Sequence, residues 1–306
     1  MQVRDQTIPA TDGFPLSATI FQGSNRHWTV INSATGVKRA YYCKFAAFLA
    51  GKGWSVVIYD YRGIGASRPK SLRGFEARMR DWGQKDFNGV MRWVESQKAD
   101  RVAVIGHSLG GQVLAFAENP DGIDRFLAVA AQSGHWRYWN FPRKYFLASL
   151  WYLIMPALSR LMGYFPSRCM GLGEDLPKGV ALEWARWCRH PDYCLGQKHQ
   201  MEFPGLAYKR PILAYSFSDD PFCPPEASKA YLGWFGQAPV EQRPLEPRDL
   251  GVNELGHFAF FRSDFRETLW QEGADWLAQI REFQVAPSSG TEYKGLKIGL
   301  EFQTLK

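Results

Sequence analysis

Cysteine is scarce in this chain, and its cysteines follow no pairing pattern. The 306 residues include five cysteines, with no C-x-x-C pair and no spacing typical of metal ligands. An odd number of cysteines in this arrangement argues against a complete disulfide framework. We therefore expect a reducing compartment, the cytoplasm, and neither a metal nor a cofactor.

Long apolar runs are also missing. The first ten residues are polar, with charges at Arg4 and Asp5, so no secretory signal is expected. The longest uncharged stretch lies between Lys144 and Arg160 and is interrupted by Pro156. It is shorter than the ~20 apolar residues that span a bilayer. This stretch is predicted to be a lid or core helix rather than a membrane anchor.

Basic runs are absent, although the net charge is +7 and 45% of the residues are hydrophobic. Lysine and arginine are scattered along the chain, and no nucleic-acid motif is present. We therefore expect no nucleic-acid partner. The composition is that of a globular protein with one large core or two smaller ones, and nothing in it indicates the oligomeric state.

Apolar segments of strand length alternate with segments of helical periodicity. The strands are expected within a hairpin over residues 7–21 and at 28–31, 54–59, 102–105, 126–131, 211–217 and 240–244. Helices are expected at 40–50, 81–97, 112–117, 226–235 and 263–283. This alternation predicts an α/β fold with a mainly parallel sheet that carries helices on both faces.

The segment 135–205 differs in composition from the rest of the chain. It holds five of the twelve tryptophans, together with nine lysines or arginines and five acidic residues, which gives it a charge of +4. We interpret it as a helical cap inserted between two late strands. The core then comprises 1–134 and 206–284, and 285–306 is expected to be a weakly ordered tail.

The pentapeptide from Gly106 to Gly110 lies between an expected strand and an expected helix. Its G-x-S-x-G pattern is typical of a nucleophile elbow, in which glycines allow the strand and the helix to approach closely. Ser108 is therefore the candidate nucleophile. A serine nucleophile needs a histidine as base and a carboxylate to orient that histidine.

His257 is the candidate base, because it lies in a glycine-containing loop between the last strand and the final helix. The candidate acid is one of two adjacent aspartates at the end of the strand after the cap. We prefer Asp220, which lies four residues before Pro224, whereas Asp219 is an alternative that is also suited to capping a turn.

These motifs give the chain a resemblance to the α/β-hydrolases. The order Ser108, Asp220, His257 is similar to that family's Ser…Asp/Glu…His order, and residues 60–67 (DYRGIGAS) are similar to its D-x-R-G-x-G-x-S loop. We expect structural roles for Asp60 and the other polar residues of this loop. The resemblance covers about 7–284 and points to bacterial hydrolases related to serine aminopeptidases and monoacylglycerol lipases.

The resemblance implies an oxyanion hole built from backbone N–H groups. Leu109, directly after the nucleophile, is the expected first donor, and Thr35 or Ala34 in the loop after the expected strand at 28–31 is the second. A metal-free serine hydrolase that cleaves an apolar carboxylic ester is the expected activity. Acyl transfer, thioester or amide hydrolysis, and a lipid- or membrane-surface-binding protein with a vestigial site are the alternatives. Weak membrane contact through the cap is also expected.

Overall fold

The computed structural model describes residues 2–279, and a single eight-stranded sheet forms its centre. Every strand that the sequence predicts is present, although the first begins at Gln2 rather than at Thr7. The strands are β1 (Gln2–Pro9), β2 (Pro15–Gln22), β3 (His27–Asn32), β4 (Ser55–Tyr59), β5 (Arg101–His107), β6 (Arg125–Val129), β9 (Ile212–Phe217) and β10 (Val240–Leu245).

The strand order is β1-β2-β4-β3-β5-β6-β9-β10. The β1–β2 and β2–β4 pairs are antiparallel, and the other neighbours are parallel. The predicted hairpin around Asp12 and Gly13 joins β1 to β2, where Gly13 has the positive φ that such turns require. The mainly parallel sheet of the prediction is confirmed. Its parallel strands end at one edge, so the loops that follow them meet there.

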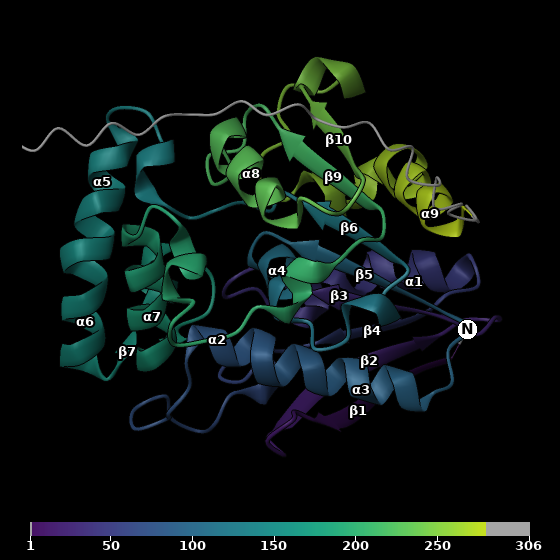
Figure 1. Cartoon of the computed structure of the whole chain (residues 1–306), viewed down its shortest axis with the longest axis horizontal. Coiled ribbons are helices and arrows are strands. Elements are labelled where there is room, and N and C mark those ends of the chain that lie inside the picture. Colours follow the sequence, from purple (N-terminus) through teal and green to yellow (C-terminus); the bar gives the residue numbers. More distant parts are fainter. Residues whose placement is uncertain (1, 280–306) are drawn as a thin grey trace, which may run out of the picture.

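Two hydrophobic clusters cover the two faces of the sheet. Successive strand residues point to opposite faces, and Val104 accordingly joins one cluster while Ile105 joins the other. The helices that cover the faces are α1 (Cys43–Gly51), α2 (Met79–Asp81), α3 (Asn88–Ser96), α4 (Leu109–Gln112), α8 (Pro225–Leu232) and α9 (Gln271–Ala278). In Figure 1, α1 and α9 lie side by side, and α3 lies on the other side of the sheet.

The last described helix is shorter than expected. The sequence predicts one helix over 263–283, but two short turns precede α9, and the helix ends at Ala278 because Gln279 turns to an extended conformation. The helical pattern of the sequence continues beyond Ala278, so periodicity alone does not show where the helix ends. The expected helical residues 280–283 lie outside the described residues. The expected tail at 285–306 lies outside the described residues.

The segment 135–205 forms a helical layer at the end of the sheet where the parallel strands finish (Figure 1). It contains α5 (Arg143–Ser149), α6 (Met155–Met162), α7 (Lys178–Arg189) and a small hairpin of β7 (Tyr164–Phe165) and β8 (Leu176–Pro177). A turn of π-helix at Leu150–Ile154 joins α5 to α6. Pro156 is the second residue of α6, directly after this turn, so the helix continues where the sequence suggested an interruption.

The loop that follows β4 is a structural brace. The carboxylate of Asp60 accepts the backbone N–H groups of Arg39 and Ala66 at 2.7 and 2.9 Å. The hydroxyl of Ser67 donates to the Asp60 carbonyl at 2.7 Å and accepts the Ser17 N–H at 2.8 Å. These bonds hold the loop against β2 and give its polar residues the structural roles expected from the sequence.

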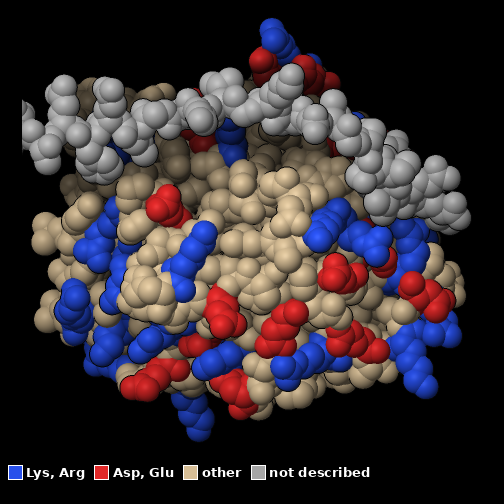
Figure 2. Space-filling model, viewed as in Figure 1, with Lys and Arg blue, Asp and Glu red and all other residues tan. Residues whose placement is uncertain are grey.

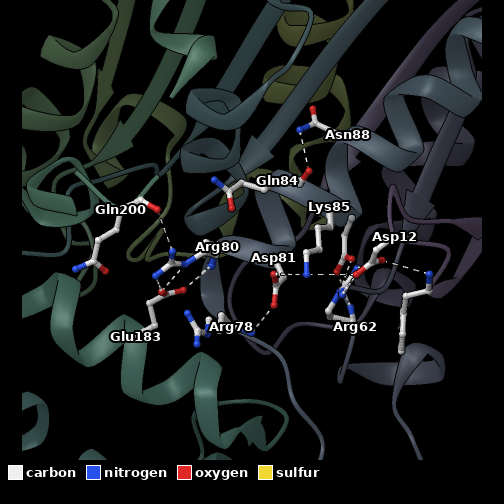
Figure 3. A network of polar contacts seen from close by, with 12 residues as sticks. Asp12, Arg62, Arg78, Arg80, Asp81, Gln84, Lys85, Asn88, Glu183 and Gln200 are labelled. Atoms are coloured by element: carbon white, nitrogen blue, oxygen red, sulfur yellow. Dashed lines mark hydrogen bonds and ion pairs between the residues drawn. The ribbon is translucent and has the colours of Figure 1, made fainter. Parts of the chain in front are cut away.

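Arg62 is the centre of a buried ion-pair network (Figure 3). Its Nε donates to Asp86 at 2.6 Å, and its two terminal nitrogens donate to Asp12 at 2.8 Å each. Burial raises the pKa of Asp86 to about 7, although the bonds from Arg62 favour the ionised carboxylate. Arg62 therefore stabilises a carboxylate that has no access to water.

A second ion pair in Figure 3 joins the core to the cap. Arg80 follows the start of α2, and its backbone N–H and Nε donate to the carboxylate of Glu183 on α7 at 2.9 and 2.7 Å. Both side chains are largely buried. The cap is thus attached to the core by charge as well as by apolar packing, for example between Phe203 and Phe116, whose rings lie 5.0 Å apart.

We expect Arg62→Met to lower the free energy of unfolding by about 3–5 kcal/mol at neutral pH, because Asp86 loses its buried partner. The loss should be smaller at pH 5 than at pH 8, since a protonated carboxyl is neutral in the folded state and needs no cation. Denaturant unfolding at both pH values measures this. Arg92→Met, which breaks an exposed pair with Glu118, is the control and should cost less than about 1 kcal/mol. Equal effects of the two substitutions would contradict the role of Arg62.

Candidate active site

Ser108 occupies a strained turn between β5 and α4. Its backbone has φ 54° and ψ −117°, a conformation that residues other than glycine rarely adopt. A Cβ atom at Gly106 would overlap the backbone of Gly110 and Gly111, and one at Gly110 would overlap Asn32. The two glycines of the motif therefore allow the close approach that the sequence predicts, and the turn holds Ser108 at the carboxyl end of β5.

His257 and Asp220 form a buried pair, although 37 residues separate them. Nδ1 of His257 lies 2.7 Å from Oδ2 of Asp220. The other oxygen of Asp220 accepts the backbone N–H groups of Phe222 and Cys223 at 2.7 and 3.1 Å. Because a carboxylate only accepts hydrogen bonds, the Nδ1 proton of His257 points toward Asp220. Nε2 of the neutral ring is then available as a proton acceptor.

The neighbouring aspartate has a different set of partners. Asp219 accepts the backbone N–H groups of Leu255 and Gly256 at 2.8 and 3.0 Å. It therefore fixes the loop that carries His257 but does not contact the imidazole. These contacts distinguish the two adjacent carboxylates that the sequence left as alternatives: Asp220 contacts the imidazole, and Asp219 does not.

Ser108 and His257 line the same cavity, but within residues 2–279 no hydrogen bond joins their side chains. Oγ of Ser108 instead lies 3.3 Å from Nε2 of Gln132, which also donates to the Phe222 carbonyl at 3.2 Å. Gln132 follows β6 and was not among the site residues predicted from the sequence. An amide at the end of a strand gives no comparable signal of function.

A buried chain of hydrogen bonds connects three loops of the site. Nε2 of His107 is 3.0 Å from the carbonyl of His257, and Nδ1 is 2.8 Å from the hydroxyl of Tyr42. Burial lowers the pKa of His107 well below its usual range and raises the pKa of Tyr42, so both are neutral. The carbonyl requires a proton on Nε2, so the Tyr42 hydroxyl donates to Nδ1. The same hydroxyl accepts the Ala34 N–H at 2.9 Å.

This chain separates the two candidates for the second oxyanion donor. The N–H of Ala34 is directed to Tyr42 and away from the cavity. Thr35, the next residue, lines the cavity, and its N–H has no hydrogen-bond partner among the residues that the structure describes. Leu109 begins α4 and also lines the cavity. Its N–H belongs to the first helical turn, whose amides lack partners within the helix.

The cavity between the sheet edge and the cap has a volume of about 670 Å³. Ser108 and His257 line it from the core, and the cap contributes apolar walls. Its apolar cap residues include Phe146, Leu150, Trp151, Met155, Phe165 and Trp184. Such a space suits an apolar group held beside the serine.

The cap also rests directly on the loop that contains Thr35. The backbone N–H of Glu174 donates to the Gly36 carbonyl at 2.8 Å, and the Glu174 carboxylate lies 3.3 Å from Nζ of Lys38. Any displacement of this part of the cap would therefore act on the loop that presents the Thr35 N–H.

Comparison with known proteins shows which family model and which solved structures this chain resembles. The family model of the serine aminopeptidase S33 group matches residues 28–170. An esterase from Exiguobacterium antarcticum is 17% identical, with a TM-score of 0.59 over 90% of this chain and 100% of its own. A monoacylglycerol lipase from Paleococcus ferrophilus is 16% identical, with a TM-score of 0.55 over 86% and 98%. Among curated proteins, no match was found.

The fold is therefore that of the α/β-hydrolases, as the sequence motifs indicated. Residues 28–170, just under half of the chain, are similar to the serine aminopeptidase group.

We expect Tyr42→Phe to lower the free energy of unfolding by about 1–3 kcal/mol, because the Ala34 N–H and Nδ1 of His107 lose their buried partner while the ring remains. Tyr41→Phe is the matched control. It removes an exposed hydrogen bond of the adjacent tyrosine to the Phe258 carbonyl and should change stability far less. Chemical denaturation of the two variants compares them, and similar losses would show that the buried chain does not stabilise the site.

Proposed function

We propose that this protein hydrolyses carboxylic esters with apolar acyl groups through an acyl-enzyme. One observation carries the proposal: a serine on a strained turn and a histidine paired with a carboxylate line one cavity with apolar walls. Serine is a weak nucleophile at neutral pH, and a neighbouring histidine–carboxylate pair is the arrangement that activates it.

In the first half of the reaction, Oγ of Ser108 rotates from Gln132 toward Nε2 of His257 and attacks the ester carbonyl carbon. His257 takes the hydroxyl proton, and Asp220 stabilises the imidazolium that forms. The negative charge on the carbonyl oxygen is held by the N–H groups of Leu109 and Thr35, and each such donor contributes roughly 3 kcal/mol of transition-state stabilisation.

The tetrahedral species then loses the alcohol, which leaves with the proton carried by His257. The acyl group remains on Ser108 as an ester. A water molecule gives a proton to His257 and attacks that ester, and the carboxylic acid departs as the proton returns to Oγ of Ser108. The net reaction consumes one ester and one water and yields one acid and one alcohol.

The cavity walls support the choice of an apolar acyl group. Side chains such as Leu150 and Met155 provide no hydrogen bonds, so they favour hydrocarbon over a polar substituent. The proposed partner is accordingly a small molecule, an ester with an apolar acyl group.

A fluorophosphonate probe tests whether Ser108 is the nucleophile. We expect the wild-type protein to form one covalent adduct, located at Ser108 by peptide mass spectrometry, and Ser108→Ala to form none. Ser167→Ala is the control, because Ser167 is buried and lines the same cavity, and this variant should be labelled like the wild type. Labelling that persists in Ser108→Ala would assign the reactive hydroxyl to another residue.

The two aspartates should differ in their effect on turnover. With p-nitrophenyl butyrate, Asp220→Asn should lower kcat by roughly 10³- to 10⁴-fold, because the imidazole loses its orienting carboxylate. Asp219→Asn should lower kcat by less than about tenfold, since it alters only the loop contacts. Circular dichroism checks that both variants are folded. A larger loss for Asp219→Asn would transfer the acid's role to that residue.

A further inference from the structure

The outer helix of the cap exposes an unusual number of apolar side chains. α5, the π-helical turn and α6 form one helical run, Arg143–Met162, of 20 residues. By length and composition alone this run is apolar enough to cross a membrane. Its exposed side chains, with their exposed fractions, are Tyr145 (57%), Phe146 (56%), Tyr152 (54%), Leu153 (66%) and Leu161 (84%).

These side chains form one face of the helix, which we call the outer apolar face. Their common exposure defines this face: Tyr145 and Phe146 lie on α5, Tyr152 and Leu153 on the π-helical turn, and Leu161 on α6. The opposite side carries Leu150, Trp151 and Met155, which are buried and line the cavity. The inner side is buried because it packs against α7 and borders the cavity. In the part of the chain that the structure describes, nothing covers the outer apolar face.

The chain around the outer apolar face carries charge of one sign along the sequence. Residues 126–173 contain no aspartate or glutamate but include five arginines or lysines. Arg143 and Lys144 stand at the start of the helix, with Arg143 over the Phe222 ring and Lys144 over the Tyr145 ring. At the left edge of Figure 2, where α5 and α6 lie in Figure 1, uncharged surface borders several Lys and Arg side chains.

The cavity opens beside this face. Five residues that line the cavity are also exposed hydrophobics, so they form its rim: Phe146, Met170, Leu172, Phe222 and Phe258. Phe146 belongs both to the rim and to the outer apolar face. An apolar molecule that leaves the surface contacted by the helix therefore meets apolar side chains at the rim of the cavity.

We propose that the outer apolar face docks on an anionic phospholipid bilayer, with the helix Arg143–Met162 lying in the plane of the interface. Apolar side chains enter the acyl region while the flanking cations contact anionic headgroups. The helix lies on the membrane instead of spanning it, because its inner side is committed to the cavity wall and to α7. This inference also names a substrate class, and that part rests on the proposed function: the substrate is an acyl ester that partitions into the bilayer.

Sedimentation of the full chain with vesicles tests the docking. We expect the protein to bind vesicles of phosphatidylcholine with 30% phosphatidylglycerol, to bind pure phosphatidylcholine more weakly, and to lose affinity as salt rises. Leu153→Glu and Leu161→Glu should each lower the partition constant by about tenfold, because a carboxylate enters the interface and repels anionic headgroups.

Val3→Glu is the matched control. Val3 is 49% exposed on β1, far from the cap in sequence and on the edge strand of the sheet, so this variant adds the same charge and should bind vesicles like the wild type. Absence of vesicle binding by the wild type, or an equal loss in Val3→Glu, would overturn the proposal. A dimer that dissociates in Leu153→Glu, measured by light scattering, would also overturn it by assigning the face to a second copy.

Two further measurements separate this proposal from the proposed function. Ser108→Ala should bind vesicles like the wild type, and Leu153→Glu should hydrolyse soluble p-nitrophenyl butyrate at the wild-type rate while losing activity on a vesicle-embedded long-chain ester. If Ser108 takes up no probe but the vesicle results hold, the docking stands and the esterase function fails. If Leu153→Glu hydrolyses both esters at the wild-type rate, the bilayer is not the source of substrate.

Discussion

The site depends on one buried chain of hydrogen bonds that runs from the Ala34 N–H through Tyr42 and His107 to the carbonyl of His257. Each member belongs to a different segment, and the chain has one consistent arrangement of protons because His107 is neutral. It therefore fixes the loop after β3, the turn after β5 and the loop after β10 relative to one another. The imidazole that pairs with Asp220 is positioned through its own backbone, so its ring stays free for proton transfer.

The inner strands of the central sheet were predictable because they are buried on both faces. Segments such as Ser55–Tyr59 are continuous apolar runs, and their length and alternation with helical segments are local signals. The proximity of Ser108, Asp220 and His257 could likewise be predicted, because parallel strands bring their carboxyl ends to one edge whatever the sequence distance between them. The preference for Asp220 over Asp219 agrees with the observed contact to His257.

The remaining features depend on contacts that no local pattern encodes. Tyr42 meets His107 across 65 residues, and Gln132 approaches Ser108 only because β6 lies beside β5. The direction of the Ala34 N–H follows from that tyrosine, so the sequence had to leave Ala34 and Thr35 as alternatives. Pro156 was misleading for a related reason, since the π-helical turn before it absorbs the disruption that proline normally causes.

The cap's attachments restrict how a substrate reaches Ser108. Glu183 holds α7 to Arg80, and the Glu174 N–H holds the cap's returning segment to Gly36. Lifting the cap as a rigid body would break a buried ion pair and disturb the loop of Thr35 together. The side chain of Phe146 on the rim is exposed and has no such anchor among the described contacts, so its movement is the less costly route. Under the proposed function, the route of the acyl chain past the rim is then separate from the anchored segment that holds the Thr35 loop in place.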